Sequence, residues 1–274
     1  MRLAEPASTS WKAGLYLGFE FRNEKTILSE KRSDGPLVVQ KPLYPEGDET
    51  CHAIVVHPPG GIAGGDELEL RVKAGGRACA LLTTPGAAKW YRSAGPWARQ
   101  RLAFEISGNL EWLPRETIVF DGALASLESE IVLRKDAAYI GWEVVCLRRS
   151  GSGERFRRGQ VRMETKIFRD ARLLWLERGK IEGGGTLMRS PAGLAQHSVF
   201  GTLVAAASEV PKGLLAACRE GAKDLAVTLL PGLLLARYLG DSSEQAMQCF
   251  ARLWEAARPS IMGKTAIAPR IWST

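Results

Sequence analysis

The sequence predicts a mainly β protein, built from stacked, largely antiparallel sheets with a small C-terminal helical part of two helices. Two observations carry this prediction. Apolar and polar residues alternate over most of the first 180 residues, and the spacing of apolar residues becomes helical near residue 210. The chain has 274 residues, of which 45% are hydrophobic and 24% charged, as in a globular protein with one large domain or two small ones.

Each strand is expected from a run in which every second residue faces a core. Turn-forming pairs such as Gly75-Gly76, Gly108-Asn109 and Asp121-Gly122, together with Asp170, separate the runs and indicate short turns between neighbouring antiparallel strands. The residues expected to face inward are Leu15, Leu17, Phe19 and Phe21, then Leu68, Leu70 and Val72, then Leu102, Phe104 and Ile106, then Leu127, Ser129, Ile131 and Leu133, and finally Val161, Met163, Thr165 and Ile167.

Two helices are expected near the C-terminus, at Pro211–Ala222 and Ser243–Arg258, because their apolar residues recur at helical spacing. Ser242 and Gln245 stand in capping-box relation at the start of the second helix, and Pro259 is expected to end it.

The stretch between the two helices predicts two more strands that meet at Pro231-Gly232. A single domain over residues 1–274 is therefore expected. It has a β-rich body at 1–209 and a helical and apolar C-terminal part at 210–274, which is not independent because no linker precedes it.

Composition favours a cytoplasmic protein without a membrane partner. Residues 1–14 contain no apolar run that could form the core of a signal peptide, and the most apolar stretch, Leu225–Ala236, is too short to span a bilayer. The five cysteines are odd in number and scattered, with no C-x-x-C pair, so neither a disulfide framework nor a structural zinc site is expected.

The net charge of +7 is concentrated between Arg148 and Glu182, where eleven basic residues face five acidic ones. Such a segment could meet an acidic protein or nucleic acid, or it could be a solvated hairpin. Nucleic acid is disfavoured, because the interleaved aromatic residues are too few for a stacking platform.

The residues that usually carry catalysis are scarce. The chain has three histidines, no G-x-S-x-G and no H-E-x-x-H. Gly263-Lys264-Thr265 resembles the end of a phosphate-binding loop, but Arg258 stands where that loop requires a glycine. The sequence therefore favours a protein without catalytic activity of its own.

The segment His57–Asp66 packs two prolines and four glycines into ten residues. Proline fixes φ and glycine permits positive φ, so this is a loop of specified shape. Such a loop could bring bare backbone close to a ligand or another surface, or it could be a tight crossover packed inside its own protein. Residues 81–92 and 111–123 are similarly rich in motif-like residues.

With these segments in place, the chain resembles the UreD family of urease accessory proteins, called UreH in some organisms. The resemblance covers nearly the full length. It rests on H-P-P-G-G-x-x-G-G-D at 57–66, L-T-T-P-G-A-x-K at 82–89, E-W-L-P-x-E-x-I-x-F-D-G-A at 111–123, G-E-x-F-x-x-G at 153–159, P-G-L at 231–233, R-Y-L-G at 237–240 and P-R-I-W-S-T at 269–274. The motif residues singled out are His57, Pro58, Pro59, Gly60, Gly61, Gly64, Gly65, Thr83, Thr84, Pro85, Gly86 and Lys89.

The resemblance implies a maturation factor with an unusual mainly β fold. With UreF, and with the GTPase UreG held through UreF, it would form a complex on apo-urease that inserts nickel. The resemblance implies no tightly bound cofactor. It does imply a tunnel through which nickel passes in transit. Ligands that hold nickel loosely suit such a route, since a tight site would not release it. The candidates for a transient nickel path are Asp66, Asp121, Glu143, Glu164 and Glu177; for each, the alternative is a charge that caps a turn or pairs with an arginine.

The C-terminal segment is the candidate contact for UreF, because an amphipathic helix and an apolar tail suit burial against a partner. The alternative is that both pack on the protein's own sheets. The residues proposed for this contact are Phe250, Trp254, Pro269, Arg270, Ile271 and Trp272. A different class of function also stays open, an anion- or metal-binding enzyme that uses the glycine-rich loop at 57–66 with His57 as acid or base.

Overall fold

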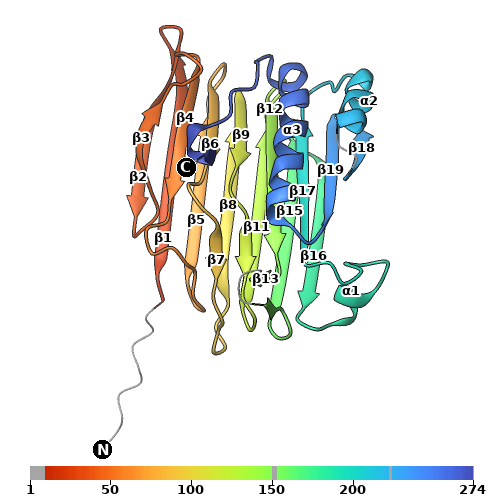
Figure 1. Cartoon of the computed structure of the whole chain (residues 1–274). Coiled ribbons are helices and arrows are strands. Elements are labelled where there is room, and N and C mark those ends of the chain that lie inside the picture. The colour runs from red at the N-terminus through yellow and green to blue at the C-terminus, as the bar shows by residue number, and fades with distance from the viewer. Residues whose placement is uncertain (1–9, 150–152, 222–223, 274) are drawn as a thin grey trace, which may run out of the picture.

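The computed structural model describes residues 10–149, 153–221 and 224–273. Two β-sheets pack face to face, and two helices cover the outer face of one of them (Figure 1). The seven-stranded sheet has the order β16-β15-β11-β8-β5-β1-β2, and the ten-stranded sheet has the main order β18-β19-β17-β12-β9-β6-β4-β3, with β7 and β10 beside it. Mainly β architecture in stacked sheets is thereby confirmed.

The strand bounds follow. The seven-stranded sheet contains β1 (Lys12–Arg22), β2 (Lys25–Asp34), β5 (Glu67–Ala74), β8 (Ala98–Ile106), β11 (Leu124–Leu133), β15 (Gln160–Arg169) and β16 (Arg172–Glu182). The ten-stranded sheet contains β3 (Val38–Leu43), β4 (Thr50–Val56), β6 (Cys79–Thr83), β7 (Ala88–Trp90), β9 (Asn109–Leu113), β10 (Thr117–Val119), β12 (Ala138–Cys146), β17 (Val199–Ala206), β18 (Leu225–Leu230) and β19 (Leu233–Gly240). A small hairpin pairs β13 (Arg148–Arg149) with β14 (Glu154–Arg155).

The central strands of both sheets pair in parallel, which corrects the expectation of largely antiparallel pairing. Strands β1, β5, β8, β11 and β15 run parallel to one another, as do β4, β6, β9 and β12. The chain coils between the layers, so β4, β6, β9 and β12 begin 29, 30 and 29 residues apart. The pairs β1–β2, β15–β16, β3–β4 and those of β17 to β19 are antiparallel.

The reason for the difference lies in the short turns. Gly75-Gly76, Gly108-Asn109 and Asp121-Gly122 each join a strand of one sheet to a strand of the other, whereas Asp170 lies in a true hairpin between β15 and β16. Alternation and turn residues look the same in both arrangements, because each strand still buries one face. The turns also stack closely: a Cβ on Gly108 would lie 2.3 Å from the carbonyl oxygen of Ala78.

Two hydrophobic cores lie on the two faces of the ten-stranded sheet. Along β12, Tyr139 and Val145 face the seven-stranded sheet, whereas Ile140, Trp142 and Val144 face the helices.

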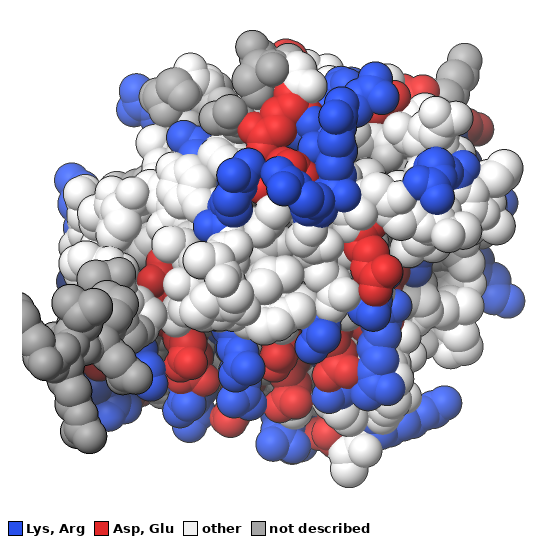
Figure 2. All heavy atoms as spheres, turned by 90° about the horizontal axis from the view of Figure 1, so that it is seen from below, with Lys and Arg blue, Asp and Glu red and all other residues white. Residues whose placement is uncertain are grey.

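Seen from below, acidic and basic side chains alternate along the side of the molecule that the seven-stranded sheet forms, and the middle of this end shows few charges (Figure 2). Ion pairs such as Lys166–Glu164 and Arg71–Glu69 account for part of this charged face.

The helical elements are α1 (Thr186–Arg189), α2 (Lys212–Gly221), α3 (Ser243–Met262) and the 3₁₀ turn η2 (Arg270–Ser273). Both expected helices are present. Ala222, the expected end of the first helix, and Thr274, the last residue of the C-terminal motif, lie outside the described residues. Pro259 does not end α3. The helix continues to Met262 and is capped by Gly263, which has a φ of 67° and donates its N–H to the Pro259 carbonyl at 3.1 Å.

Proline is tolerated there because it removes a single hydrogen bond close to the helix end. The carbonyl left without a donor is that of Glu255, which is exposed. The Ser242 side chain accepts a hydrogen bond from the Gln245 N–H, as expected for the N-cap. Within the described residues, no helix is both long and apolar enough to cross a membrane.

Candidate functional site

A cavity of about 820 Å³ lies between the two sheets. Strands β5, β8, β11, β15 and β16 line it on one side, and β4, β12, β17 and β19 line it on the other. Much of the lining is apolar, with Leu70, Ile131, Met163 and Val204 among its residues. A cavity of this size within an otherwise packed core is the default candidate for a functional site.

A belt of polar residues crosses this cavity at one level. In the ten-stranded sheet, Thr202 of β17 lies directly between Glu143 of β12 and Arg237 of β19. In the seven-stranded sheet, Thr165 of β15 lies between Ser129 of β11 and Glu177 of β16. Directly paired residues of neighbouring strands share a face, so each trio points to the same side of its sheet. All six residues line the cavity.

Glu177 and Arg237 join the two sheets at the edge of the belt, where the Arg237 Nη1 donates to the Glu177 Oε1 at 2.6 Å. Arg237 also lies over the Trp175 ring, 5.9 Å from its centroid. The neighbouring Arg178 turns away and pairs with Glu164. Strand alternation predicts that Glu177 and Arg178 have separate partners, and the structure confirms it.

Glu143 is the second carboxylate of the belt, and its side chain makes no hydrogen bond or ion pair with any other described residue, although its backbone belongs to the β12–β17 ladder. Burial, and to a smaller extent the negative charge of Glu177, raise the pKa of Glu143 to about 7. Its partly exposed surface faces the cavity. Near neutral pH, Glu143 can therefore take up or release a proton.

His57 brings an imidazole to the same cavity from the end of β4. Its Nε2 is buried without a hydrogen-bond partner, and burial lowers the pKa of His57, against the opposing effect of Asp66. A neutral imidazole with an unpartnered nitrogen can accept a hydrogen bond or a metal ion.

The loop that follows His57 is a crossover between the layers. It joins β4 to β5 and forms a parallel bridge from Ile62 to Trp90. Side chains at two of its glycines would collide with their surroundings: a Cβ on Gly61 would lie 1.9 Å from the Tyr91 ring, and one on Gly64 would lie 2.2 Å from the Ser93 Oγ. The shape of this loop is therefore set by packing inside its own protein.

Three of the five predicted nickel-path carboxylates lie away from the cavity. Asp66 accepts the N–H groups of Trp11 and Ala63 at 2.8 and 2.7 Å, and so ties the loop to β1. Glu164 pairs with Lys166 and Arg178. Glu143 and Glu177 are thus the members of the set that the structure brings together in the cavity.

Asp121 is the third of these carboxylates, and it organises the turn that leads into β11. Burial alone would raise the pKa of Asp121, but the N–H groups of Arg158 and Arg157, at 2.8 and 2.7 Å, lower it below its usual value. Asp121 therefore stays ionised and holds the start of β15 against the turn.

The second motif segment lies on the wall of the cavity. Thr84, Pro85, Gly86 and Lys89 line it, whereas Thr83 is buried. The Thr83 hydroxyl donates to the Leu113 carbonyl at 2.6 Å and accepts the Trp272 indole N–H at 2.9 Å. The segment thereby connects the cavity wall to the C-terminal tail.

The residues predicted for the UreF contact divide into two groups. Phe250 and Trp254 are fully buried against the ten-stranded sheet, so their side chains are covered by the protein itself. Pro269 is also buried, Ile271 and Trp272 are half-buried, and Arg270 is exposed. The Trp272 ring lies 5.6 Å from the rings of both Trp142 and Trp254.

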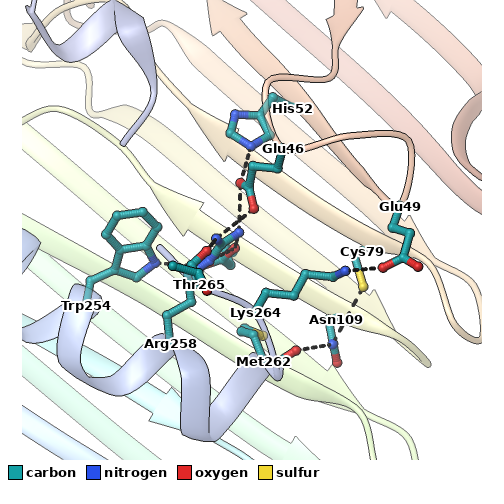
Figure 3. A network of polar contacts seen from close by, with 11 residues as sticks. Glu46, Glu49, His52, Cys79, Asn109, Trp254, Arg258, Met262, Lys264 and Thr265 are labelled. Atoms are coloured by element: carbon teal, nitrogen blue, oxygen red, sulfur yellow. Dashed lines mark hydrogen bonds and ion pairs between the residues drawn. The ribbon is translucent and has the colours of Figure 1, made fainter. Parts of the chain in front are cut away.

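A buried ionic network was not foreseen from the sequence. Arg258 of α3 lies between Glu46 and Glu111, and Glu46 in turn contacts the His52 Nε2 at 2.5 Å (Figure 3). The Trp254 indole donates to Glu111 at 2.6 Å. An arginine on the apolar stripe of a predicted helix is the signal that could have revealed this site, since a buried arginine needs acidic partners.

Within residues 10–149, 153–221 and 224–273, no group of three or more His, Cys, Asp or Glu side chains is placed to hold a metal ion.

Comparison with known proteins decides the family. A family model described as "UreD urease accessory protein" matches residues 12–273. This chain belongs to the UreD family. It is 53% identical to the urease accessory protein UreD of Azoarcus sp. (strain BH72), covering 100% of this chain and 98% of the relative. It is 50% identical to that of Dechloromonas aromatica, over 97% and 96%, and 49% identical to that of Pseudomonas aeruginosa PAO1, over 97% and 96%.

Proposed function

We propose that this chain is a urease maturation factor and that its inter-sheet cavity passes nickel toward apo-urease. The family supports the role in urease maturation, since the relatives are named urease accessory protein UreD. The observation that carries the proposed route is the polar belt, which places Glu143 and Glu177 inside a cavity that is otherwise largely apolar.

The belt suits a cation in transit. Glu143 has no competing cationic partner, so an entering divalent ion would meet a free carboxylate once the proton has left. Arg237 already neutralises Glu177, which weakens the pull of that carboxylate on the ion. The neutral imidazole of His57 offers nickel a nitrogen ligand at another part of the cavity. Such dispersed ligands allow release, whereas a closed set of four would retain the metal.

We propose that the chain acts as a scaffold in a complex with UreF, and through UreF with UreG, with GTP hydrolysis belonging to UreG. The chain itself would have no catalytic activity and no resident cofactor, and nickel would be its cargo. We further propose that it acts in the cytoplasm, where apo-urease is assembled.

A deletion experiment tests the role in maturation. Cells that express urease without this chain should contain folded urease with little nickel, and re-expression of the chain should restore the metal. Nickel per urease active site is measured by elemental analysis of the purified enzyme. Full nickel loading without the chain would rule out the proposal.

A further inference from the structure

Exposed leucines occur on three elements that lie at one side of the molecule. The described residues include seven large hydrophobic side chains that are clearly exposed, and four of these lie on β16, α1 and β19. They are Leu173, Leu176, Leu187 and Leu239, with exposed fractions of 46%, 40%, 42% and 43%. Strands β16, β18 and β19 and helix α1 lie together at the right of the molecule in Figure 1.

Strand β16 forms one edge of the seven-stranded sheet. Among the described residues it pairs with β15, and its other side has no strand beside it. It is 11 residues long and contains the apolar run Leu173–Leu176. A long apolar edge strand presents unpaired N–H and C=O groups to any extended segment, and proteins normally protect such edges with charge.

The opposite edge of the same sheet, β2, has no large apolar side chain among the clearly exposed ones. In β2, residues 29–34 read Ser-Glu-Lys-Arg-Ser-Asp, and most of them are exposed. Both edge strands contain charged residues, but β16 adds the exposed Leu173 and Leu176, so its apolar surface does not follow from edge position alone.

The ten-stranded sheet extends past β16. The ion pair of Glu177 with Arg237 places β16 over β19, and β18 lies one strand further out. In β18, Leu225 and Val227 are buried with the helices, whereas Ala226 and Thr228 point to the other face and are exposed. The inner face of β18 thus forms a ledge that β16 does not cover.

The cavity reaches this ledge. Its lining includes Ala226, Arg237 and Leu239, all of which are exposed. The end of the polar belt, the free edge and the ledge therefore form one continuous surface.

The charges of this surface indicate the kind of partner. Arg178, Lys180 and Arg237 are paired with Glu164, Glu182 and Glu177. Among the described residues of β16 and α1, Arg172 and Arg189 have no acidic partner, so the surface keeps a positive excess. A second copy of the chain would set like charges against each other, whereas an acidic segment would be attracted.

We propose that an extended segment of a partner protein, with alternating apolar and acidic residues, pairs with β16 as an eighth strand and covers the β18 ledge. Backbone hydrogen bonds would supply affinity, and apolar side chains facing Leu239 and Ala226 would supply specificity. The added strand would close the side of the cavity. This inference rests on the proposed function, because it names the surface at which the maturation partners meet the chain.

Hydrogen exchange of the whole chain tests the inference without any mutation. The chain is mixed separately with apo-urease, with UreF, and with UreF together with UreG. In one of these complexes the amides of 172–182 should exchange at least about tenfold more slowly, while those of 25–34 in β2 should keep their rate.

The outcomes are distinct. A complex in which residues 172–182 exchange as in the free chain would overturn the inference and leave the proposed function standing. If the chain formed no complex with any of these proteins, the proposed function would be rejected, and the inference with it.

A charge substitution provides the second measurement. The double variant Leu173→Glu with Leu176→Glu should weaken the complex by about tenfold or more, because both exposed side chains border the added strand and acidic groups would repel it. The comparison variant is Ile267→Glu, which alters a side chain of similar exposure, 43%, in the C-terminal segment, the alternative candidate for this contact. Equal melting temperatures would show that all variants fold. Loss of binding in the Ile267 variant with binding retained in the double variant would assign the contact to the C-terminal segment instead.

Discussion

Arg258 and Glu111 form a fully buried ion pair that fixes helix α3 to the ten-stranded sheet. The Arg258 Nη2 lies 2.8 Å from the Glu111 Oε2, and Arg258 also reaches Glu46 and the Thr265 carbonyl. Burial raises the pKa of Glu111 in spite of Arg258, whereas the hydrogen bonds from His52 and Arg258 overcome burial and lower the pKa of Glu46. One guanidinium thus joins β9, the segment before β4 and the C-terminal tail (Figure 3).

Replacing Arg258 should be among the most destabilising single changes in the chain. Arg258→Met leaves two buried carboxylates without their cation, and we expect a loss of about 3–5 kcal/mol in the free energy of unfolding. Arg258→Lys keeps the charge but not the planar fork, so its loss should be smaller. Urea unfolding measures both variants. A stability of Arg258→Met equal to that of the wild type would contradict the role given to this network.

The stacked turns predict a sharp difference between two glycines. In Gly108→Ala the new Cβ would meet the backbone oxygens of Ala78 and Gly75 at 2.3 and 2.5 Å, and we expect a loss of about 1–3 kcal/mol through overpacking. Gly76→Ala is the matched control, because nothing lies within 4 Å of its Cβ position. Thermal unfolding compares the two variants, and equal effects would argue against the crossover turns described above.

The pKa of Glu143 makes stability depend on pH. Its value is raised from 4.5 to about 7 in the folded chain, so between these pH values the folded state binds more protons than the unfolded one. The contribution of Glu143 to stability should therefore fall as pH rises from 4.5 to 7 and then level off. Glu143→Gln lacks this contribution, and urea unfolding at a series of pH values should show the variant gaining on the wild type over that window. Parallel pH profiles would refute the assignment.

Removing the second carboxylate should shift that profile. In Glu177→Gln the negative charge beside Glu143 is lost, so the pKa of Glu143 should move down toward its ordinary value. It should stay raised in part, because burial is the larger cause. A titration of the Glu143 carboxyl followed by NMR in both proteins gives the two values. An unchanged pKa would mean that the two carboxylates do not interact.

The sequence was sufficient for the strand faces but not for the strand order. The alternation of Leu68, Leu70 and Val72, or of Phe104 and Ile106, identifies the buried face correctly, since all of these residues are buried. Turns such as Gly108-Asn109 do not reveal whether the next strand lies beside the last one or in the other layer. The spacing of 29 to 30 residues between β4, β6, β9 and β12 was the available signal for a coiled chain.

The site was foreseen in part. Ser129 and Thr165 interrupt inward-facing apolar runs, which marks the polar belt, and the separation of Glu177 from Arg178 follows from strand alternation. The partner of Glu177, Arg237, lies 60 residues away, and no local pattern connects the two. For the same reason the partners of Arg258, which lie far earlier in the chain, could not be inferred from helical spacing.

The passage of nickel through the cavity is tested most directly by loading purified apo-urease with nickel in the presence of the accessory proteins. The chain is supplied as wild type, as the double variant Glu143→Gln with Glu177→Gln, or as Glu130→Gln, which changes an exposed carboxylate of β11. The rate at which nickel is loaded per active site should fall by about tenfold with the double variant, because the cation loses its charged ligands. The rate should be unaffected by Glu130→Gln. Loading by the double variant at the wild-type rate, with the complex intact, would contradict the account.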